Sequence, residues 1–264
     1  MSTAPARPVV LITGAARRIG RAIALDMAGR GYDVAIHFRQ SRDAAEAAVV
    51  EMRGLGARAV ALAGDLAKPE DVARLVPECC AALGPPSVLV NNASEFQPDS
   101  VVSTTLESWT AHLDINLRAP VFLAQDLVRH LPAGTDGNII NIIDQRVWKL
   151  TPEFFSYTLS KAGLWTATRT LAQALAPRVR VNAIGPGPVL KSIHQTEEDF
   201  AAEVASTLLH RGPSTAEIAA AVRFILDAPA MTGQMIALDG GQHLTWSEGE
   251  HNPTAINALA DGNS

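Results

Sequence analysis

Two side chains that could carry out acid–base chemistry, Tyr157 and Lys161, stand four residues apart. On a helix this spacing places both on one face, about one turn from each other. A phenol has an ordinary pKa of about 10 and is a poor acid at neutral pH, but a nearby ammonium group favours the phenolate and lowers that pKa. The pair therefore predicts a tyrosine that exchanges a proton with a bound substrate. An exposed helix with a solvated lysine would show the same spacing, so the neighbouring residues have to decide.

Length and composition indicate one globular domain. The 264 residues are 47% hydrophobic and 19% charged, and the formal net charge of -5 gives no indication of nucleic-acid or anionic-membrane binding. No apolar run reaches the ~18 residues that span a bilayer, and the N-terminus lacks the pattern of a signal peptide. The adjacent Cys79 and Cys80 fit neither a disulfide framework nor a metal site. We expect a cytoplasmic protein without a metal centre.

Strand-like and helix-like segments alternate along the chain. The expected strands are residues 8–13, 33–38, 58–63, 87–91, 138–143, 178–184 and 234–238, and the expected helices are residues 18–30, 42–55, 69–83, 105–131, 153–176 and 215–227. This alternation predicts a Rossmann-type α/β fold, a doubly wound parallel sheet flanked by helices. We assign residues 8–246 to this single domain, residues 1–7 to an N-terminal arm and residues 247–264 to a polar C-terminal tail.

In such a sheet, ligands bind beyond the carboxyl ends of the strands, so the residue types found there are informative. The first expected strand runs into TGAARRIG, in which Gly14 and Gly20 flank the start of a helix. Glycines let a backbone approach a pyrophosphate, and a helix N-terminus adds free N–H groups and a favourable dipole. A plain strand–helix turn could use the same glycines, but the position after the first strand favours a dinucleotide site.

The end of the second expected strand favours NADPH over NADH. A site for NAD usually has an acidic residue here for the ribose 2′-hydroxyl, but the sequence reads His37-Phe38-Arg39-Gln40-Ser41. A 2′-phosphate suits the guanidinium of Arg39 or of Arg17, with Ser41 as a further donor. Arginines that only face solvent are the alternative.

Polar residues also follow the third and fourth expected strands. Asp65, next to Leu66, could accept a hydrogen bond from an adenine amine or cap the following helix. Asn91 and Asn92 could join loops through their side-chain amides or close a turn. Alone, these residues leave both readings open.

Taken in order, these motifs resemble the short-chain dehydrogenase/reductase family. The resemblance rests on TGAARRIG, Asp65-Leu66, NNAS, Asn116, Tyr157-x-x-x-Lys161 and the GPGPV of residues 185–189, and it extends over roughly residues 8–246. It implies that Tyr157 is the acid–base residue and that Lys161 binds the nicotinamide ribose and lowers the Tyr157 pKa. It also implies that Asn116 holds a water in the proton relay.

The resemblance further implies a cofactor site for NADPH. Gly14, Arg17 and Gly20 would line the phosphates, Asp65 and Leu66 the adenine, Asn92 and Ala93 the adenine ribose, and Pro186, Gly187 and Val189 the nicotinamide; Ile19, His37, Phe38, Arg39, Ser41 and Ser94 complete the expected cofactor contacts.

Two positions depart from the family pattern. Arg18 stands where the middle glycine is usual, and Asp144 stands thirteen positions before Tyr157, where a catalytic serine is usual. A hydroxyl can donate to a ketone oxygen, whereas an ionised carboxylate only accepts and repels developing negative charge. Asp144 therefore argues against ordinary ketone chemistry. In a partly dry cleft it could stay protonated or accept N–H groups, which suits a nitrogen heterocycle.

Within the family, this combination resembles the pteridine reductases and the related bacterial dihydropteridine-type reductases, which act on dihydromonapterin or dihydrofolate. The shared features are the two arginines after Gly-Ala-Ala, the basic segment after the second strand, the aspartate and Asn-Ala-Ser-x-Phe. The resemblance implies that a pterin lies between the nicotinamide and Phe96, near Ser94, Asp144, Tyr157 and Leu190. It predicts NADPH-dependent reduction of a C=N bond of a dihydropterin or dihydrofolate, with Tyr157, Asp144 and Lys161 supplying the proton.

Two other functions fit parts of the sequence. A carbonyl reductase, such as a 3-oxoacyl thioester reductase, would use the same cofactor site but leaves Asp144 and Phe96 unexplained. A catalytically silent NADPH sensor would need neither Tyr157 nor Lys161. Residues 188–212 correspond to the variable substrate loop of the family; within it His194 fits a solvated residue better than a substrate contact, and Trp148 could line the pocket or be structural. The segment DGGQHLTW (239–246) resembles the tail that forms an interface in the family's homotetramers.

Overall fold

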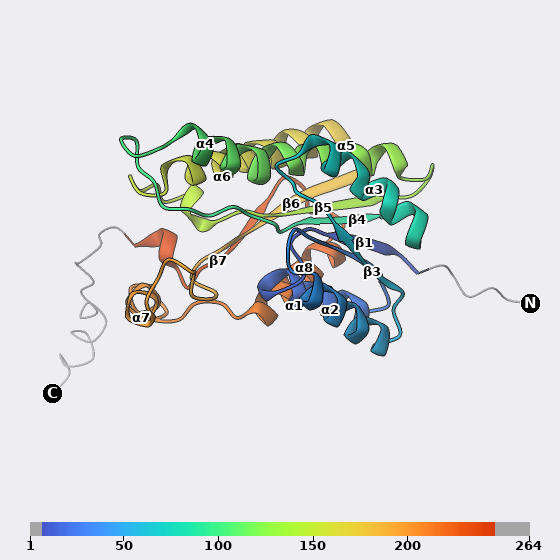
Figure 1. Cartoon of the computed structure of the whole chain (residues 1–264), viewed down its shortest axis with the longest axis horizontal. Helices are drawn as coiled ribbons and strands as arrows, with labels where there is room; N and C mark the ends of the chain where they lie inside the picture. Colours follow the sequence, from blue (N-terminus) through green and yellow to red (C-terminus); the bar gives the residue numbers. More distant parts are fainter. Residues whose placement is uncertain (1–6, 246–264) are drawn as a thin grey trace, which may run out of the picture.

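The computed structural model describes residues 7–245, and these form one seven-stranded parallel sheet in the order β3-β2-β1-β4-β5-β6-β7 (Figure 1). The strands are β1 (Val9–Ile12), β2 (Asp33–Phe38), β3 (Ala59–Ala63), β4 (Val88–Asn91), β5 (Gly137–Ile142), β6 (Val179–Pro186) and β7 (Met235–Leu238). This is the predicted doubly wound fold. Trp246, the expected tail 247–264 and all but Arg7 of the expected N-terminal arm lie outside the described residues.

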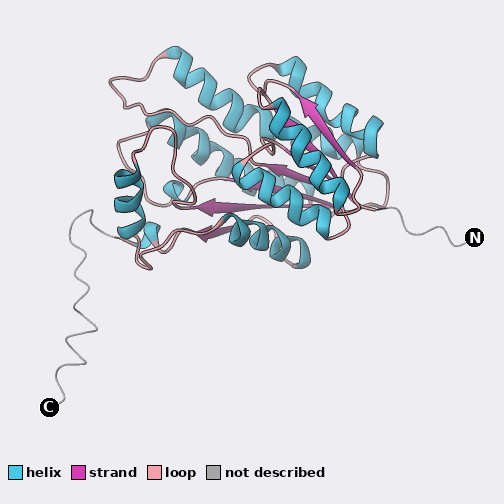
Figure 2. Cartoon of the chain, turned by 60° about the horizontal axis from the view of Figure 1, so that its bottom comes forward, coloured by secondary structure: helices cyan, strands magenta, loops and turns pink. Residues whose placement is uncertain are grey.

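Helices cover both faces of the sheet. On one face lie α1 (Arg18–Gly29), α2 (Arg42–Gly54) and α8 (Thr215–Asp227); on the other lie α3 (Pro69–Leu83), α4 (Leu106–Leu113), α5 (Ala119–His130) and α6 (Phe155–Leu175) (Figure 1). In Figure 2 the strands, in magenta, run between these cyan layers. None of the described helices has the length and apolarity needed to cross a membrane.

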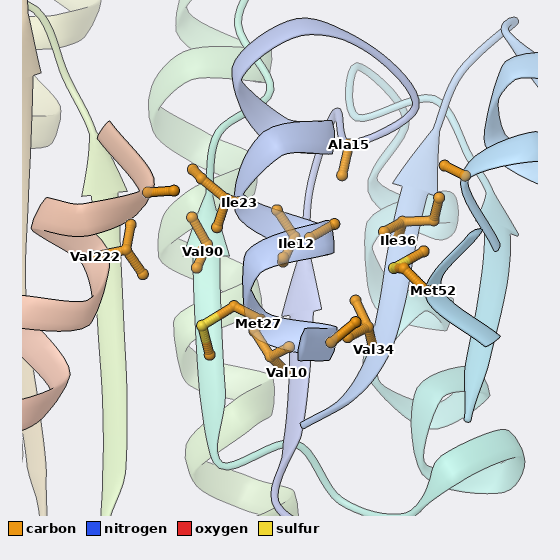
Figure 3. Close-up of a cluster of buried hydrophobic side chains, with 14 of the residues drawn as sticks. Val10, Ile12, Ala15, Ile23, Met27, Val34, Ile36, Met52, Val90 and Val222 are labelled. Carbon is orange, nitrogen blue, oxygen red and sulfur yellow. The ribbon is translucent and has the colours of Figure 1, made fainter. Parts of the chain in front are cut away.

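The strands are apolar throughout because both faces of the sheet are buried. All four residues of β1 are buried, and successive side chains point to opposite faces. Val10 and Ile12 therefore pack in the core under α1, where Figure 3 shows Ile23 and Met27 directed towards them. Val9 and Leu11 contribute to the other core, under α3 and α5. This packing fixes the register of the strands and so the positions of the loops at their carboxyl ends.

The helix expected over residues 105–131 is wrong as a single element. It consists of α4, a π-helical turn at Asp114–Arg118 and α5. Pro120 has no N–H for the carbonyl of Asn116, so the ordinary helical ladder cannot continue there. The wider turn contains Asn116, whose side chain is fully buried.

A further helix, α7 (Glu197–Ala205), lies within residues 188–212 and was not expected. It begins with a capping box in which the Thr196 and Asp199 side chains each bond the backbone N–H of the other residue. No side chain of α7 is buried within the described chain, and the helix lies apart from the layers that cover the sheet (Figure 1). The sequence carries the capping signal but no apolar face, which is why periodicity did not reveal the helix.

The loops after β1 and β4 are joined through Asn92. Its side-chain amide donates to the carbonyl oxygens of Thr13 (2.9 Å) and Gly14 (3.0 Å), as the sequence allowed. Gly20 packs against this junction so closely that an added Cβ would lie 2.5 Å from Nδ2 of Asn92 and 2.6 Å from the Gly14 oxygen. Gly29, at the end of the same helix, has no atom within 4 Å of such a Cβ.

Two alanine substitutions in α1 should therefore have opposite effects on stability. Gly29→Ala should raise the free energy of unfolding by about 0.5–1 kcal/mol, because alanine loses less backbone entropy on folding. Gly20→Ala should lower it by about 1–3 kcal/mol, because the backbone of the loop has to move. Urea unfolding followed by circular dichroism measures both. Equal stability of the two variants would contradict the close packing of the β1 and β4 loops.

Candidate active site

Two adjoining cavities, of about 770 Å³ and 410 Å³, lie at the loops that follow the strands. Arg18, Ile19, Asn92 and Ser94 line both, so the two form one groove. The smaller cavity is lined by all of the expected adenosine and phosphate residues, namely Gly14, Arg17, Ile19, Gly20, His37, Phe38, Arg39, Ser41, Asp65, Leu66, Asn92, Ala93 and Ser94. The larger is lined by Asp144, Tyr157, Lys161, Pro186, Gly187, Val189, Leu190, Ser94 and Phe96.

In the smaller cavity, His37 supports the glycine loop from within the sheet. Its Nδ1 accepts from the Gly14 N–H at 3.2 Å, so Nε2 carries the proton and donates to the Gly64 carbonyl at 3.1 Å. The ring is almost wholly buried, and this burial lowers the His37 pKa. A neutral His37 therefore holds the loop in place. Asp65 accepts a hydrogen bond from the Ala67 N–H at 3.0 Å and closes a turn. It does not cap α3, whose N-cap position is occupied by Lys68 without a side-chain capping bond.

Arginines supply positive charge at the wall of the smaller cavity. Arg17 is exposed at the start of α1, and Arg39, at the end of β2, has 49% of its side chain exposed. A guanidinium nitrogen of Arg39 lies 3.6 Å from a carboxylate oxygen of Glu95, which enters the cavity from the loop after β4. The β2 end itself has no carboxylate.

Arg18 links the glycine loop to the segment that leads into α7. Its backbone has φ +54°, the left-handed conformation that glycine adopts most easily. Its guanidinium donates to the carbonyl oxygens of Leu190 (3.0 Å) and Lys191 (2.9 Å). The sequence marked Arg18 only as a departure from the family pattern, since its partners lie more than 170 positions away along the chain.

In the larger cavity, Tyr157 and Asp144 share a hydrogen bond. The Tyr157 hydroxyl donates to Oδ2 of Asp144 at 2.8 Å, and Oδ1 of Asp144 accepts from the Arg146 N–H at 2.8 Å. Lys161 donates from Nζ to the Ile142 carbonyl at 3.0 Å and lies 5.7 Å from the centre of the Tyr157 ring. Tyr157 and Lys161, one turn apart on α6, are 5% and 2% exposed.

The electrostatics correct one prediction from the sequence. Burial raises the pKa of Tyr157 well above its ordinary value, and the adjacent Asp144 carboxyl raises it further; Arg146 and Ser94 oppose this rise only in part. The Asp144 carboxyl is hydrogen-bonded to the Tyr157 hydroxyl, so its charge acts on that hydroxyl at short range. Burial also raises the pKa of Asp144 and lowers that of Lys161 to about 8, an effect that Asp144 partly opposes.

Asn116 lies outside the residues that line either cavity. Its Oδ1 accepts from the Glu95 N–H at 2.8 Å, and its Nδ2 donates to the Glu95 carbonyl at 2.9 Å and to the Ser160 hydroxyl at 3.0 Å. Asn116 thus fastens the loop after β4 to α6. The water contact expected of it stays a prediction.

An aromatic stack forms one wall of the larger cavity. The ring of Phe96 stacks on Phe154 with centroids 4.5 Å apart and planes at 9°, and it meets the Tyr157 ring edge-on at 4.7 Å. The Arg146 guanidinium lies 5.0 Å from the centre of the Phe154 ring. The sequence did not reveal Phe154 or Arg146, because the loop 145–154 has no periodicity to show which side chains face the cavity.

Contacts bear on two alternatives that the sequence left open. His194 is exposed, as expected of a solvated loop residue, and it also lines the larger cavity with its Nε2 3.2 Å from the Phe96 carbonyl. Trp148 does not line the cavity; it packs edge-on against Trp165 and His243, with ring centroids 6.3 and 5.2 Å away, which is a structural role.

Comparisons with known proteins agree with this geometry. The family model described as Enoyl-(Acyl carrier protein) reductase matches residues 14–243. A short-chain type dehydrogenase/reductase of Picea abies is 32% identical, covering 89% of this chain and 92% of that protein. A 3-oxoacyl-[acyl-carrier-protein] reductase of Synechocystis is 33% identical, covering 90% and 98%. The crystal structure of FolM alternative dihydrofolate reductase 1 from Brucella suis, in complex with NADP, is 51% identical with a TM-score of 0.89, covering 92% and 97%.

Arg39 gives a test of the smaller cavity. Arg39→Ala should weaken NADPH binding about tenfold or more, because a hydrogen bond between charged groups contributes about 1.5–3 kcal/mol, and should leave NADH binding unchanged. Arg42→Ala is the matched control, since Arg42 lies nearby but outside the cavity lining. Fluorescence titration with both dinucleotides measures the dissociation constants. Equal weakening of NADPH and NADH binding would contradict the assignment.

The raised pKa of Asp144 predicts a pH-dependent effect on stability. The folded protein binds this proton more tightly than the unfolded chain, so Asp144 costs stability as the pH rises above about 4, where the unfolded side chain ionises. Asp144→Asn should therefore raise the melting temperature at pH 8, and the gain should shrink towards pH 4. Thermal unfolding across this range measures it, with the exposed Asp136→Asn as a control for net charge. A gain of equal size at every pH would contradict the prediction.

Proposed function

The chain belongs to the short-chain dehydrogenase/reductase family as an NADP(H)-dependent oxidoreductase, and we propose that it reduces a C=N bond of a dihydropterin or dihydrofolate. The 51% identity to FolM alternative dihydrofolate reductase 1 supports this substrate class. The single observation that carries the proposal is the 2.8 Å hydrogen bond from Tyr157 to the partly buried carboxyl of Asp144.

The smaller cavity fits NADP(H) in shape and charge. A Cβ added to Gly14 would lie 2.8 Å from the Cα of Ala93, and a Cβ added to Gly20 would lie closer still to its neighbours. Only glycine at these two positions leaves the cavity open. Arg17 and Arg39 supply cations for the 2′-phosphate, and Pro186, Gly187 and Val189 would border the nicotinamide ring. When bound, the cofactor supplies the hydride.

Tyr157 and Asp144 supply the proton. Asp144 has a raised pKa and accepts a hydrogen bond from the Tyr157 hydroxyl, so the pair holds a proton beside the substrate site. A carboxylate in this position would repel an alkoxide that develops on a ketone oxygen, but it favours a ring nitrogen that gains a proton and positive charge. Lys161 places its ammonium beneath the Tyr157 ring and would bind the nicotinamide ribose.

Phe96 favours a flat substrate. One face of its ring rests on Phe154, which is backed in turn by Arg146, so the aromatic wall is already ordered. A pterin can stack on such a wall with little further loss of side-chain entropy. An acyl thioester has no planar ring to use this surface.

A 3-oxoacyl thioester reductase is the second candidate, and the 33% identity to the Synechocystis protein favours it. It would use the same cofactor cavity, but it leaves the Asp144 carboxyl and the aromatic wall without a role. A silent sensor for NADPH is disfavoured because Tyr157, Asp144 and Lys161 converge in the larger cavity. A Tyr157→Phe variant that kept its biological output would favour the sensor.

The proposal includes a cytoplasmic homotetramer. Phe122 of α5 and Leu159 of α6 are 51% and 41% exposed on the outer side of the helical layer, where they could pack against another copy of the chain. Burial raises the pKa of the Cys79 thiol to about 12, so this cysteine is poorly reactive, as suits a reducing compartment.

Asp144→Ser tests the role of the carboxyl. The variant should lose about a hundredfold in kcat/KM with dihydrofolate, within the range expected for removal of an acid–base group, and should gain activity on a 3-oxoacyl thioester. Tyr157→Phe is the control, which should lose turnover on both substrates and still bind NADPH. NADPH oxidation followed at 340 nm, roughly the absorbance maximum of the reduced cofactor, measures these rates. Faster dihydrofolate reduction by Asp144→Ser would contradict the proposed function.

A further inference from the structure

A buried polar cluster lies behind the aromatic wall, outside the residues that line the two cavities. His112 of α4 and Ser156 of α6 are both fully buried, and Nδ1 of His112 lies 2.7 Å from the Ser156 hydroxyl. Nε2 of His112 accepts from the backbone N–H of Gln97 at 3.1 Å. The Ser156 hydroxyl also bonds the Asp99 carboxylate, which accepts from Thr104 at 2.6 Å.

The direction of each hydrogen bond in this cluster follows from its fixed donors. The Gln97 N–H can only donate, so Nε2 of His112 must be unprotonated. The neutral ring then carries its proton on Nδ1 and donates to Ser156, which in turn donates to Asp99. Burial lowers the pKa of His112, although the charges of Asp99 and Glu95 oppose this and that of Lys161 reinforces it. His112 is therefore a neutral bridge with one donor and one acceptor.

The two ends of this bridge adjoin the two functional rings. Gln97 follows Phe96 in the loop after β4, and Ser156 precedes Tyr157 at the start of α6. The His112 ring packs edge-on against Tyr157 with centroids 6.0 Å apart, and the Phe96 ring also meets the Tyr157 ring edge-on, at 4.7 Å. A single side chain thus connects the backbone that carries the stacking surface to the backbone that carries the acid.

We propose that His112 is a positioning residue, which acts through Gln97 to hold the Phe96 surface and through Ser156 to hold the Tyr157 hydroxyl. This inference rests on the proposed function. The two arms of the bridge have different consequences. Loss of the Gln97 arm releases the stacking surface and weakens binding of a flat substrate, whereas loss of the Ser156 arm misplaces the acid and slows proton transfer.

Two substitutions separate these arms. The oxygen of a glutamine side chain can reach the position of Nε2, so His112→Gln keeps an acceptor for Gln97 and loses the donor to Ser156. The amide of an asparagine side chain reaches only the position of Nδ1, so His112→Asn keeps the donor to Ser156 and leaves the Gln97 N–H unpartnered. His130→Gln on the exposed part of α5 is the control for the chemical change.

Steady-state kinetics with dihydrofolate and NADPH tests the inference. His112→Asn should raise the KM for dihydrofolate about tenfold with kcat nearly unchanged, and His112→Gln should lower kcat about tenfold with KM nearly unchanged. The dissociation constant of NADPH and the parameters of His130→Gln should equal those of the wild type. Equal effects of both variants on both parameters, or a loss of melting temperature without a kinetic change, would overturn the positioning role.

The same measurements distinguish a failure of this inference from a failure of the proposed function. A wild-type enzyme that does not turn over dihydrofolate but reduces a 3-oxoacyl thioester would refute the proposed function alone. The comparison would then be made with the thioester, where His112→Gln must still lower kcat because Tyr157 is the acid for either substrate. An unchanged kcat in that variant would overturn the role of His112 on its own.

Discussion

A carboxyl group that is partly withdrawn from water needs partners, and Asp144 has them in the Tyr157 hydroxyl and the Arg146 N–H. Burial raises the pKa of both Asp144 and Tyr157; the Asp144 carboxyl raises that of Tyr157 further, whereas the Tyr157 hydrogen bond only partly offsets the rise at Asp144. The pair therefore tends to retain a proton rather than to exist as a phenolate. This is a poor arrangement for polarising a ketone and a suitable one for protonating a ring nitrogen, and the remaining features of the cleft follow the same chemistry.

The fold serves this pair by holding three segments together at the carboxyl ends of the strands. Asp144 follows β5, Tyr157 stands in the first turn of α6, and Phe96 lies in the loop after β4. Polar side chains fasten that loop in addition to the aromatic contacts of Phe96: Asn92 ties it to the glycine loop, and Asn116 ties it to α6. Hydrogen bonds are directional, so they fix the positions of these side chains more narrowly than apolar packing alone. A site for proton transfer requires such narrow positioning.

Much of the fold and of the cofactor cavity could be predicted from the sequence, because both follow from local patterns. Buried parallel strands are continuous apolar runs, and the residues after them have to meet at one edge of the sheet. The Arg18 contact with Leu190 joins segments far apart in the sequence, so no local pattern revealed it. The π-helical turn at Asn116 and the helix α7 carry local signals, Pro120 and a capping box, but no distinct apolar periodicity shows them. The direction of the Tyr157 pKa shift was mistaken for a similar reason, since spacing along α6 showed Lys161 but not the burial that sets the balance of charges.

Initial rates of NADPH oxidation with a panel of substrates test the central claim most directly. The panel contains a dihydropterin, dihydrofolate, a quinonoid pterin and a 3-oxoacyl thioester, each offered to the purified wild-type protein. A partly buried carboxyl beside Tyr157 and a stacked aromatic wall predict turnover of the dihydropterin or dihydrofolate and little turnover of the thioester. Turnover of the thioester alone would contradict the account, because it would mean that a carboxyl at position 144 supports ketone reduction as a hydroxyl does.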